Sequence, residues 1–424
     1  MADRGAPLSR RLQWEQAGNF LAAAVAARRG RGLTTIDLTE TNPTRVGLSY
    51  PESELAELLR RSSSADYPPH PLGIPEAREV LAAALSRRHD PVAPEDLVLT
   101  ASTSEAYSYL FKLFGDPGDE VLAAAPAYPL LDELAPLDGL VLRHFPLEPG
   151  RRFALDVGEI ESRLAPRSRL LALVHPANPT GSFLTQAEQD AVVELCASRG
   201  LPWISDEVFA DYALDRETAA GGARAVVGVA GRAGAAAARQ ETLCFSLGGL
   251  SKSAGLPGWK LGWIRAGGPA AERRRIVAAL ERLADAYLSV ATPVQRALGG
   301  VLALAPQIRA AILDRLRRNL AALETAFAGL PAVSVLEPEA GWSAVLRVPR
   351  LVADEELVAG ALRQAGVLVH PGYFFDFPSD GFLVLSLLPD SGNFDEGVHR
   401  LAAYLSELMS ASEDTEGNHA QDLF

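Results

Sequence analysis

Short apolar runs alternate with amphipathic segments through the middle of the chain. Each run is bounded by polar or turn-forming residues and is typical of a buried strand; the runs lie at residues 96–101, 120–126, 169–176, 202–208, 242–249 and 260–267. Between two of them, residues 185–200 place apolar side chains at three- and four-residue spacing, which predicts a helix. This alternation predicts an α/β domain whose mostly parallel sheet is flanked by helices.

A different pattern begins near residue 271. A long helical region is followed by strand patterns and a closing helix, which together predict a smaller α+β domain. We expect the N-terminal segment to pack with this small domain. The expected segments are the N-terminal segment (1–55), a large cofactor-binding domain (56–290), the small domain (291–410) and a polar, disordered tail (411–424). The low-complexity segment 221–239 is expected to be a surface loop or insertion.

Composition narrows the classes of function. Hydrophobic residues make up 48% of the chain and charged residues 22%, which is typical of a soluble globular protein. The net charge of −13 argues against a surface for nucleic acid or anionic lipid. We find no apolar run long enough to span a membrane and no secretory signal, so we expect a cytoplasmic protein. Cys196 and Cys244 lie in apolar surroundings and are expected to be buried free thiols; no metal-ligand spacing is present, so no metal is expected.

The use of lysine draws attention to one loop. Of 40 basic residues only three are lysines. Two of them, Lys252 and Lys260, lie in the stretch SLGGLSKSAGLPGWKLGWI, whereas Lys112 is expected to be a surface charge. A guanidinium does not form an imine at accessible pH, but a desolvated lysine amine does. Lys252 is therefore predicted to bind an aldehyde cofactor, namely pyridoxal 5′-phosphate.

This cofactor makes further demands on the chain. Its ring nitrogen needs a carboxylate, its phosphate needs hydroxyls, backbone amides and a cation, and its ring needs an aromatic neighbour. Candidates for each stand at or just beyond predicted strand ends, where parallel sheets bind ligands. They are Asp206, the segment 102–104, Tyr128, Ser251 and Lys260. Each alone has a plainer explanation, such as a helix cap or a turn residue, but their combination and order favour the cofactor.

Six motifs carry a resemblance to a known family. They are YPPHPLGIPEAREVLA, TASTSEAY, DPGDEVLAAAPAYP, HPANPTG, SDEVFADY and LSKSAGLPGWKLGW. In this order they resemble the class I and II aminotransferases, which are fold-type I pyridoxal-phosphate enzymes, over residues from about 36 to 405. The resemblance implies transfer of an amino group from a small-molecule donor to a keto acceptor, within a homodimer that shares its active sites.

The resemblance also implies roles for individual residues. Lys252 would bind the cofactor as an imine and then move a proton between the substrate Cα and the cofactor C4′. Asp206 would pair with the ring nitrogen, Asn178 would donate to the cofactor O3′, and Tyr128 would stack on the ring. Four residues of the same chain would hold the phosphate: Thr103, Ser104, Ser251 and Lys260. A tyrosine of the neighbouring subunit, Tyr67, would also reach it.

Several positions depart from the family pattern. Lys260 stands where an arginine is usual. Phe209 stands where many relatives have a tyrosine that donates to O3′, so we expect the lysine–cofactor linkage to have a raised pKa. Tyr212 either compensates for the missing phenol or has a packing role, and the packing role is favoured. Gly249 replaces a serine that often helps to bind the phosphate.

The largest departure is Val384, which aligns with the arginine that usually clamps the α-carboxylate of the substrate. Two explanations stay open. Either Arg45 of the N-terminal segment supplies the clamp, or the substrate lacks a free α-carboxylate, as in an amine or an amino alcohol. Arg45 is also explained simply as a surface charge.

His175 is expected to pack beneath the end of the sheet.

Three functions are compatible with these residues. The first is a pyridoxal-phosphate-dependent aminotransferase with ping-pong chemistry. The second keeps the fold and the cofactor but catalyses β-elimination, C–S bond cleavage or another reaction at Cα. The third is a non-catalytic cofactor-binding protein, a hypothesis motivated by Phe209 and Val384.

Overall fold

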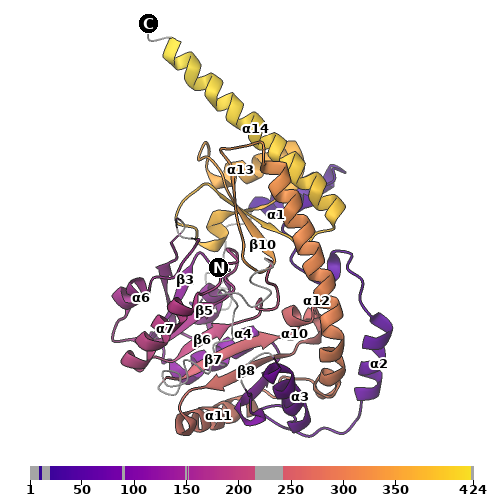
Figure 1. Cartoon of the computed structure of the whole chain (residues 1–424), viewed down its shortest axis with the longest axis vertical. Coiled ribbons are helices and arrows are strands. Elements are labelled where there is room, and N and C mark those ends of the chain that lie inside the picture. The colour runs from indigo at the N-terminus through magenta and orange to yellow at the C-terminus, as the bar shows by residue number, and fades with distance from the viewer. Residues whose placement is uncertain are drawn as a thin grey trace, which may run out of the picture.

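The computed structural model describes residues 9–11, 20–87, 91–148, 150, 152–214 and 242–421. Its centre is a seven-stranded sheet in the order β2-β8-β7-β6-β5-β3-β4 (Figure 1). The strands are β2 (Leu97–Thr100), β3 (Glu120–Ala125), β4 (Val141–Pro146), β5 (Ser168–Val174), β6 (Trp203–Asp206), β7 (Cys244–Gly249) and β8 (Gly262–Gly267).

The pairing within this sheet is mostly parallel. Only β8 runs against its neighbours β2 and β7, while the other strands pair in parallel. The prediction of an α/β domain with a mostly parallel sheet is therefore confirmed. The edge strand β4 was not predicted, because its alternating exposed positions, which include Arg143 and Pro146, lack the apolar run of a buried strand.

Helices cover both faces of the large sheet. The side chains of β3 alternate between two apolar clusters, with Val121 and Ala123 in one and Leu122 in the other. The first cluster includes residues of α4 and α11, and the second residues of α6 and α7. The bounds are α2 (Glu52–Ser62), α3 (Pro75–Ser86), α4 (Thr103–Phe114), α5 (Leu130–Leu137), α6 (Val157–Arg163), α7 (Gln186–Arg199), α10 (Leu250–Ser253) and α11 (Ala270–Asp285).

Local sequence explains where several of these helices begin and end. Thr185 and Glu188 form a capping box at the start of α7, and Gly200 ends that helix at φ 60°. Ser102 caps α4, its hydroxyl accepting from the backbone N–H of Glu105. The cap of α4 thus places that helix just after β2, and the end of α7 at Gly200 comes just before β6.

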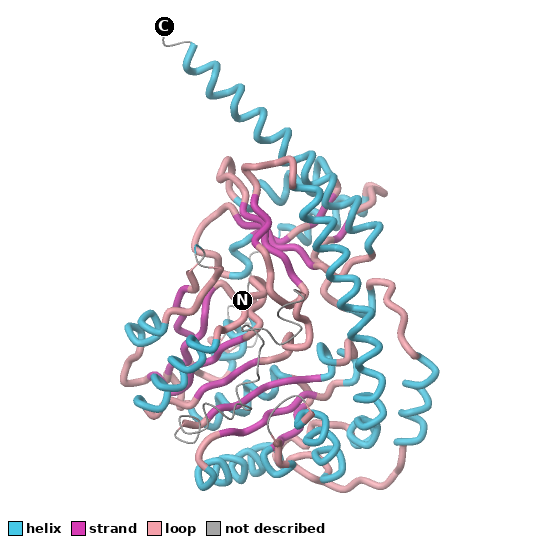
Figure 2. Tube along the Cα trace, viewed as in Figure 1, coloured by secondary structure: helices cyan, strands magenta, loops and turns pink. Residues whose placement is uncertain are grey.

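A second, smaller sheet stands above the large one in the view of Figure 2. It is antiparallel and has the order β12-β13-β10-β9. The small domain comprises α12 (Thr292–Phe327), β9 (Ser334–Leu336), β10 (Ser343–Arg347), α13 (Asp354–Gly360), β12 (His370–Pro371), β13 (Phe382–Ser386) and α14 (Ser391–Gln421). From the N-terminal segment, β1 (Ile36–Asp37) pairs in parallel with β11 (Val367–Leu368), and α1 (Phe20–Gly30) lies nearby.

Helix α12 joins the two parts of the molecule. By length and composition alone it is apolar enough to span a membrane. Its buried side chains nevertheless belong to the core, and it packs against α2, α3 and α14. A core helix of a globular protein has the same properties.

The C-terminal segment differs from the expectation of a disordered tail. Helix α14 continues to Gln421 and projects from the body of the molecule (Figure 1). A polar segment without proline can extend a helix that is already nucleated, because each further residue costs little. The low-complexity segment 221–239 lies outside the described residues.

Candidate active site

A cavity of about 480 Å³ opens between the carboxyl edge of the large sheet and the small sheet. Large-domain residues at or near the ends of β3, β4, β5, β6 and β7 line it together with Trp342, Ser343, His370, Val384 and Ser386 of the small domain. The structure brings most of the predicted cofactor-binding residues to this one place: Thr103, Ser104, Tyr128, Asn178, Asp206, Ser251, Lys252 and Lys260.

Lys252 lies on the short helix α10, directly after β7. Its Nζ is 4.3 Å from the ring centroid of Trp342 and 5.3 Å from that of Phe209. Burial lowers the pKa of Lys252 from 10.5 to about 8, although the charge of Asp206 acts in the opposite direction. A larger fraction of this amine than of an exposed lysine is therefore neutral near physiological pH, and the neutral form is the one that attacks an aldehyde.

Asp206 ends β6 and is 5% exposed. Burial raises the pKa of this carboxyl to about 6, while hydrogen bonds, including the one from the backbone N–H of Val208 at 3.2 Å, act against the rise. No ion pair joins Asp206 to Lys252 among the described side chains, although each affects the charge of the other. A buried acid and a buried amine held apart in one cavity fit a cofactor with a cationic ring nitrogen at one end and an aldehyde at the other.

The candidate phosphate site is at the start of α4. The free backbone N–H groups of a helix N-terminus favour an anion, and Thr103 and Ser104 occupy the first turn there. Lys260 is exposed beside this end of the cavity and adopts the left-handed conformation, with φ 49° and ψ 53°. This conformation is uncommon for a residue other than glycine.

Lys252 and Lys260 belong to one closed loop. The loop leaves β7 at Gly249 and enters β8 at Gly262, and these two glycines are direct partners in the antiparallel pair. The hydroxyl of Tyr212 donates to the carbonyl of Lys252 at 2.5 Å, and that of Tyr50 donates to the carbonyl of Gly255 at 2.8 Å. The hydroxyl of Tyr212 is thus engaged in positioning the lysine backbone, in agreement with the favoured packing role.

Tyr128 and Asn178 are linked through their backbones. The N–H of Tyr128 donates to the carbonyl of Asn178 at 2.8 Å. The ring of Tyr128 is 55% exposed, and its centroid is 6.4 Å from that of Phe375. The Tyr128 side chain is therefore accessible at the cavity, as ring stacking requires.

Two predicted residues lie outside the cavity lining. Tyr67 is 57% exposed before α3. Arg45 lies in a short 3-10 helix, Pro43–Arg45, and is exposed, whereas Thr39 and Thr41 of the same segment line the cavity. The structure thus does not bring Arg45 to the cavity of its own chain.

Other cavity residues escaped sequence reasoning. Trp342 and His370 come from the small domain, and Asp132 and His144 from α5 and β4. None belongs to a motif. Trp342 and His370 reach the cavity through the packing of the small domain over the large sheet, whereas Asp132 and His144 reach it from α5 and β4 of the large domain itself. The segment AGWSAVL offered one signal, a tryptophan at the start of a predicted strand.

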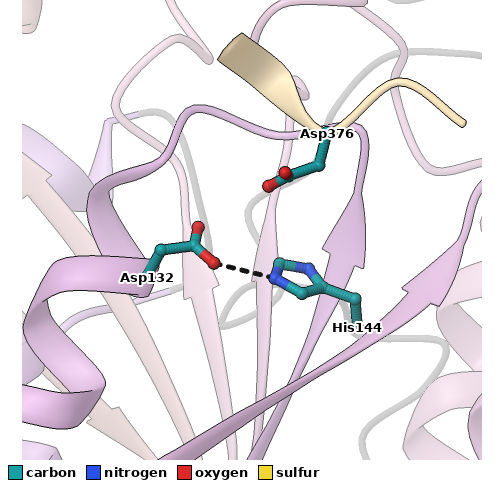
Figure 3. Close-up of side chains that lie close together, drawn as sticks. All are labelled: Asp132, His144 and Asp376. Carbon is teal, nitrogen blue, oxygen red and sulfur yellow. Dashed lines mark hydrogen bonds and ion pairs between the residues drawn. The ribbon is translucent and has the colours of Figure 1, made fainter. Parts of the chain in front are cut away.

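Asp132, His144 and Asp376 gather beside the cavity (Figure 3). One ligand atom of each lies within 4.8 Å of the others, and His144 Nε2 is 2.9 Å from Asp132 Oδ1. The hydrogen bond to Asp132 raises the pKa of His144, while burial raises the pKa of Asp376. This ion-pair geometry explains the grouping without a metal, and the expectation of no metal remains a prediction.

Three polar side chains lie as the sequence indicated. His175 is 1% exposed, and its Nε2 is 2.7 Å from Ser205 Oγ, so it packs beneath the end of the sheet. Cys196 and Cys244 are both buried thiols.

Comparison with known proteins agrees with this site. The family model for aminotransferase class I and II matches residues 39–401. An alanine aminotransferase of Mycobacterium bovis is 25% identical over 90% of this chain and 88% of its own length. An aspartate/prephenate aminotransferase of Thermus thermophilus is 27% identical over 94% and 98%. A solved alanine aminotransferase from Pyrococcus furiosus has a TM-score of 0.84 at 22% identity and covers 95% of this chain and 100% of its own.

The chain therefore belongs to the class I and II aminotransferases. It is an enzyme that transfers amino groups with pyridoxal phosphate as cofactor. The interpretation as a non-catalytic cofactor-binding protein is thereby set aside.

The depressed pKa of Lys252 is testable in the cofactor-free protein. Site-specific labelling of lysines across pH, read by mass spectrometry, should give a midpoint of about 8 for Lys252. Asp206→Asn should lower this midpoint further, because the variant lacks the negative charge that stabilises the ammonium form. A midpoint near 10.5 would contradict the burial argument.

Phe209→Tyr tests the missing phenol. Phe209 packs edge-on against Trp342 at 5.5 Å and borders Lys252, so a hydroxyl added to its ring enters the same region. We expect the spectral titration of the bound cofactor to shift to lower pH by roughly one unit, since a new hydrogen bond favours the deprotonated linkage. Phe209→Leu is the control without a hydroxyl; an unchanged titration in the tyrosine variant would refute the idea.

Gly249→Ser tests the second departure. A Cβ at this position would meet Gly262 Cα and Leu261 O at 3.4 Å and Thr103 Cγ2 at 3.9 Å, which are ordinary contacts. The serine hydroxyl should add one hydrogen bond to the phosphate and tighten cofactor binding about fivefold. Equilibrium dialysis measures this affinity, and Gly249→Ala separates the hydroxyl from the added methyl group. Weaker binding in both variants would show that the site is closed to a side chain.

Proposed function

We propose that this enzyme moves an amino group from an amino donor to a keto acceptor in two half-reactions at the described cavity. The donor's amine becomes a carbonyl and the acceptor's carbonyl becomes an amine, so no outside oxidant or reductant is needed. The observation that carries the assignment is the pair of Lys252 and Asp206, one amine and one acid with opposed pKa shifts in a single cavity.

The chain's own residues supply the proton chemistry. Lys252 Nζ would hold the cofactor and, once free, would carry a proton from the substrate Cα to the cofactor C4′. The rings of Trp342 and Phe209 border this amine. When bound, pyridoxal phosphate supplies the electron sink that makes the Cα proton removable.

The remaining residues are assigned to binding. We assign Asp206 to the ring nitrogen, Asn178 to O3′ and Tyr128 to the ring face. The groups near the start of α4 are assigned to the phosphate; they are Thr103, Ser104, Ser251 and Lys260. Their common presence in one cavity supports the whole set.

The setting of the reaction is proposed with it. We place the enzyme in the cytoplasm and in a biosynthetic process, as a homodimer in which Tyr67 reaches the phosphate of the neighbouring subunit. The exposure of Tyr67 in a single chain supports this arrangement. The names of the curated relatives, alanine and aspartate/prephenate aminotransferases, favour an amino-acid donor.

One spectroscopic experiment tests the function. Purified enzyme loaded with pyridoxal phosphate is mixed with single amino donors in the absence of a keto acceptor. We expect a donor to convert the visible band of the lysine-bound cofactor into that of its amine form, in wild type but not in Lys252→Ala. Release of ammonia and pyruvate from a β-substituted donor without an acceptor would instead establish the elimination chemistry.

A further inference from the structure

The residue opposite Val384 is a histidine. In the antiparallel pair of β12 and β13, His370 and Val384 are direct Cα partners. Side chains that face each other across such a pair project from the same face of the sheet. Both residues line the cavity, as do Ser386 and its partner Ser343. An imidazole therefore stands beside the position of the usual arginine, where Val384 itself is only 2% exposed.

Aromatic contacts fix His370 near the aromatic wall of the site. Its ring centroid is 5.6 Å from that of Phe374 and 5.7 Å from that of Phe375. Phe375 in turn contacts the ring of Tyr128. Thr39 and His370 also border a second cavity of about 630 Å³, lined by α1. His370 thus stands at the boundary of the active-site cavity, one ring away from the side chain assigned to the cofactor face.

The ring of His370 has an unsatisfied nitrogen. Nδ1 is buried and has no hydrogen-bond partner among the described residues. An enclosed N–H without an acceptor is costly, so the neutral ring is best protonated at Nε2, the nitrogen left to a ligand. Burial lowers the pKa of His370, and the charge of Asp37 partly opposes this. A carboxylate entering the cavity does not pair with Nδ1, but it accepts from the Nε2–H of this tautomer.

The other basic groups of the described lining have assignments already. Lys252 and Lys260 are assigned to the cofactor, and His144 bonds to Asp132. His370 is the remaining described nitrogen base of the lining.

We propose that His370 binds the carboxylate of the amino donor, which makes the donors α-amino acids rather than carboxylate-free amines. This inference rests on the proposed function. An imidazole offers one N–H at a time, whereas a guanidinium offers a planar fork. Carboxylate recognition by His370 is therefore weaker and less demanding in geometry than the usual clamp.

Matched donors isolate the carboxylate. L-alanine and ethylamine differ only in this group, and each is given to the pyridoxal-phosphate-loaded enzyme in the half-reaction. His370→Val should raise the KM for L-alanine ten- to one-hundredfold with little change in kcat, and should change the KM for ethylamine less than twofold. His370→Asn keeps an N–H donor and should recover part of the loss. In His144→Asn, the control within the same cavity, the L-alanine to ethylamine ratio should stay as in wild type.

A binding measurement supports the kinetics without requiring turnover. Calorimetric titration with propanoate, which is alanine without its amino group, should give an affinity that falls at least tenfold in His370→Val and not in His144→Asn. Equal losses for L-alanine and ethylamine, or propanoate binding that is indifferent to His370, would overturn the proposal. If propanoate binds through His370 and yet no donor alters the cofactor band, the carboxylate site stands and the proposed half-reaction fails.

Discussion

The separation of a buried amine from a buried carboxylate governs the rest of this site. Burial lowers the pKa of Lys252 and raises that of Asp206, so it favours the neutral form of both groups. The charge of each group opposes the shift of the other. Asp206 is the last residue of β6, whereas Lys252 lies three residues beyond the end of the neighbouring strand β7, on α10. The amine and the carboxylate therefore enter the same cavity from different elements.

Much of the large domain was predictable because its strands are continuous apolar runs with polar residues at one end. β2, β3, β5, β6, β7 and β8 all follow that rule. The edge strand β4 does not follow it, since an edge position leaves some of its side chains in solvent. The end of α14 was missed for a related reason, because polarity indicates exposure and does not by itself exclude a helix.

The same distinction applies to the site. Residues of the cofactor side, such as Asn178 and Asp206, lie in contiguous motifs and could be found from sequence order. Trp342 and His370 reach the cavity only through packing of the small sheet over the large one, and local sequence does not encode that contact. The engagement of Tyr212 with the carbonyl of Lys252 was equally inaccessible, because it depends on a hydrogen bond between residues forty positions apart. Thr39 and Thr41 line the cavity and Arg45 of the same segment does not, so a role for Arg45 as the clamp stays a prediction.

The closed loop between Gly249 and Gly262 has a consequence for the effects of mutation. Strand pairing holds its two ends together, so Lys252 and Lys260 lie within one short closed loop of backbone. The residues proposed to bind the cofactor belong to the large domain, while Trp342, His370 and Val384 belong to the small one. A mutation in the small domain would therefore change the wall offered to the donor and leave the proposed cofactor contacts in place.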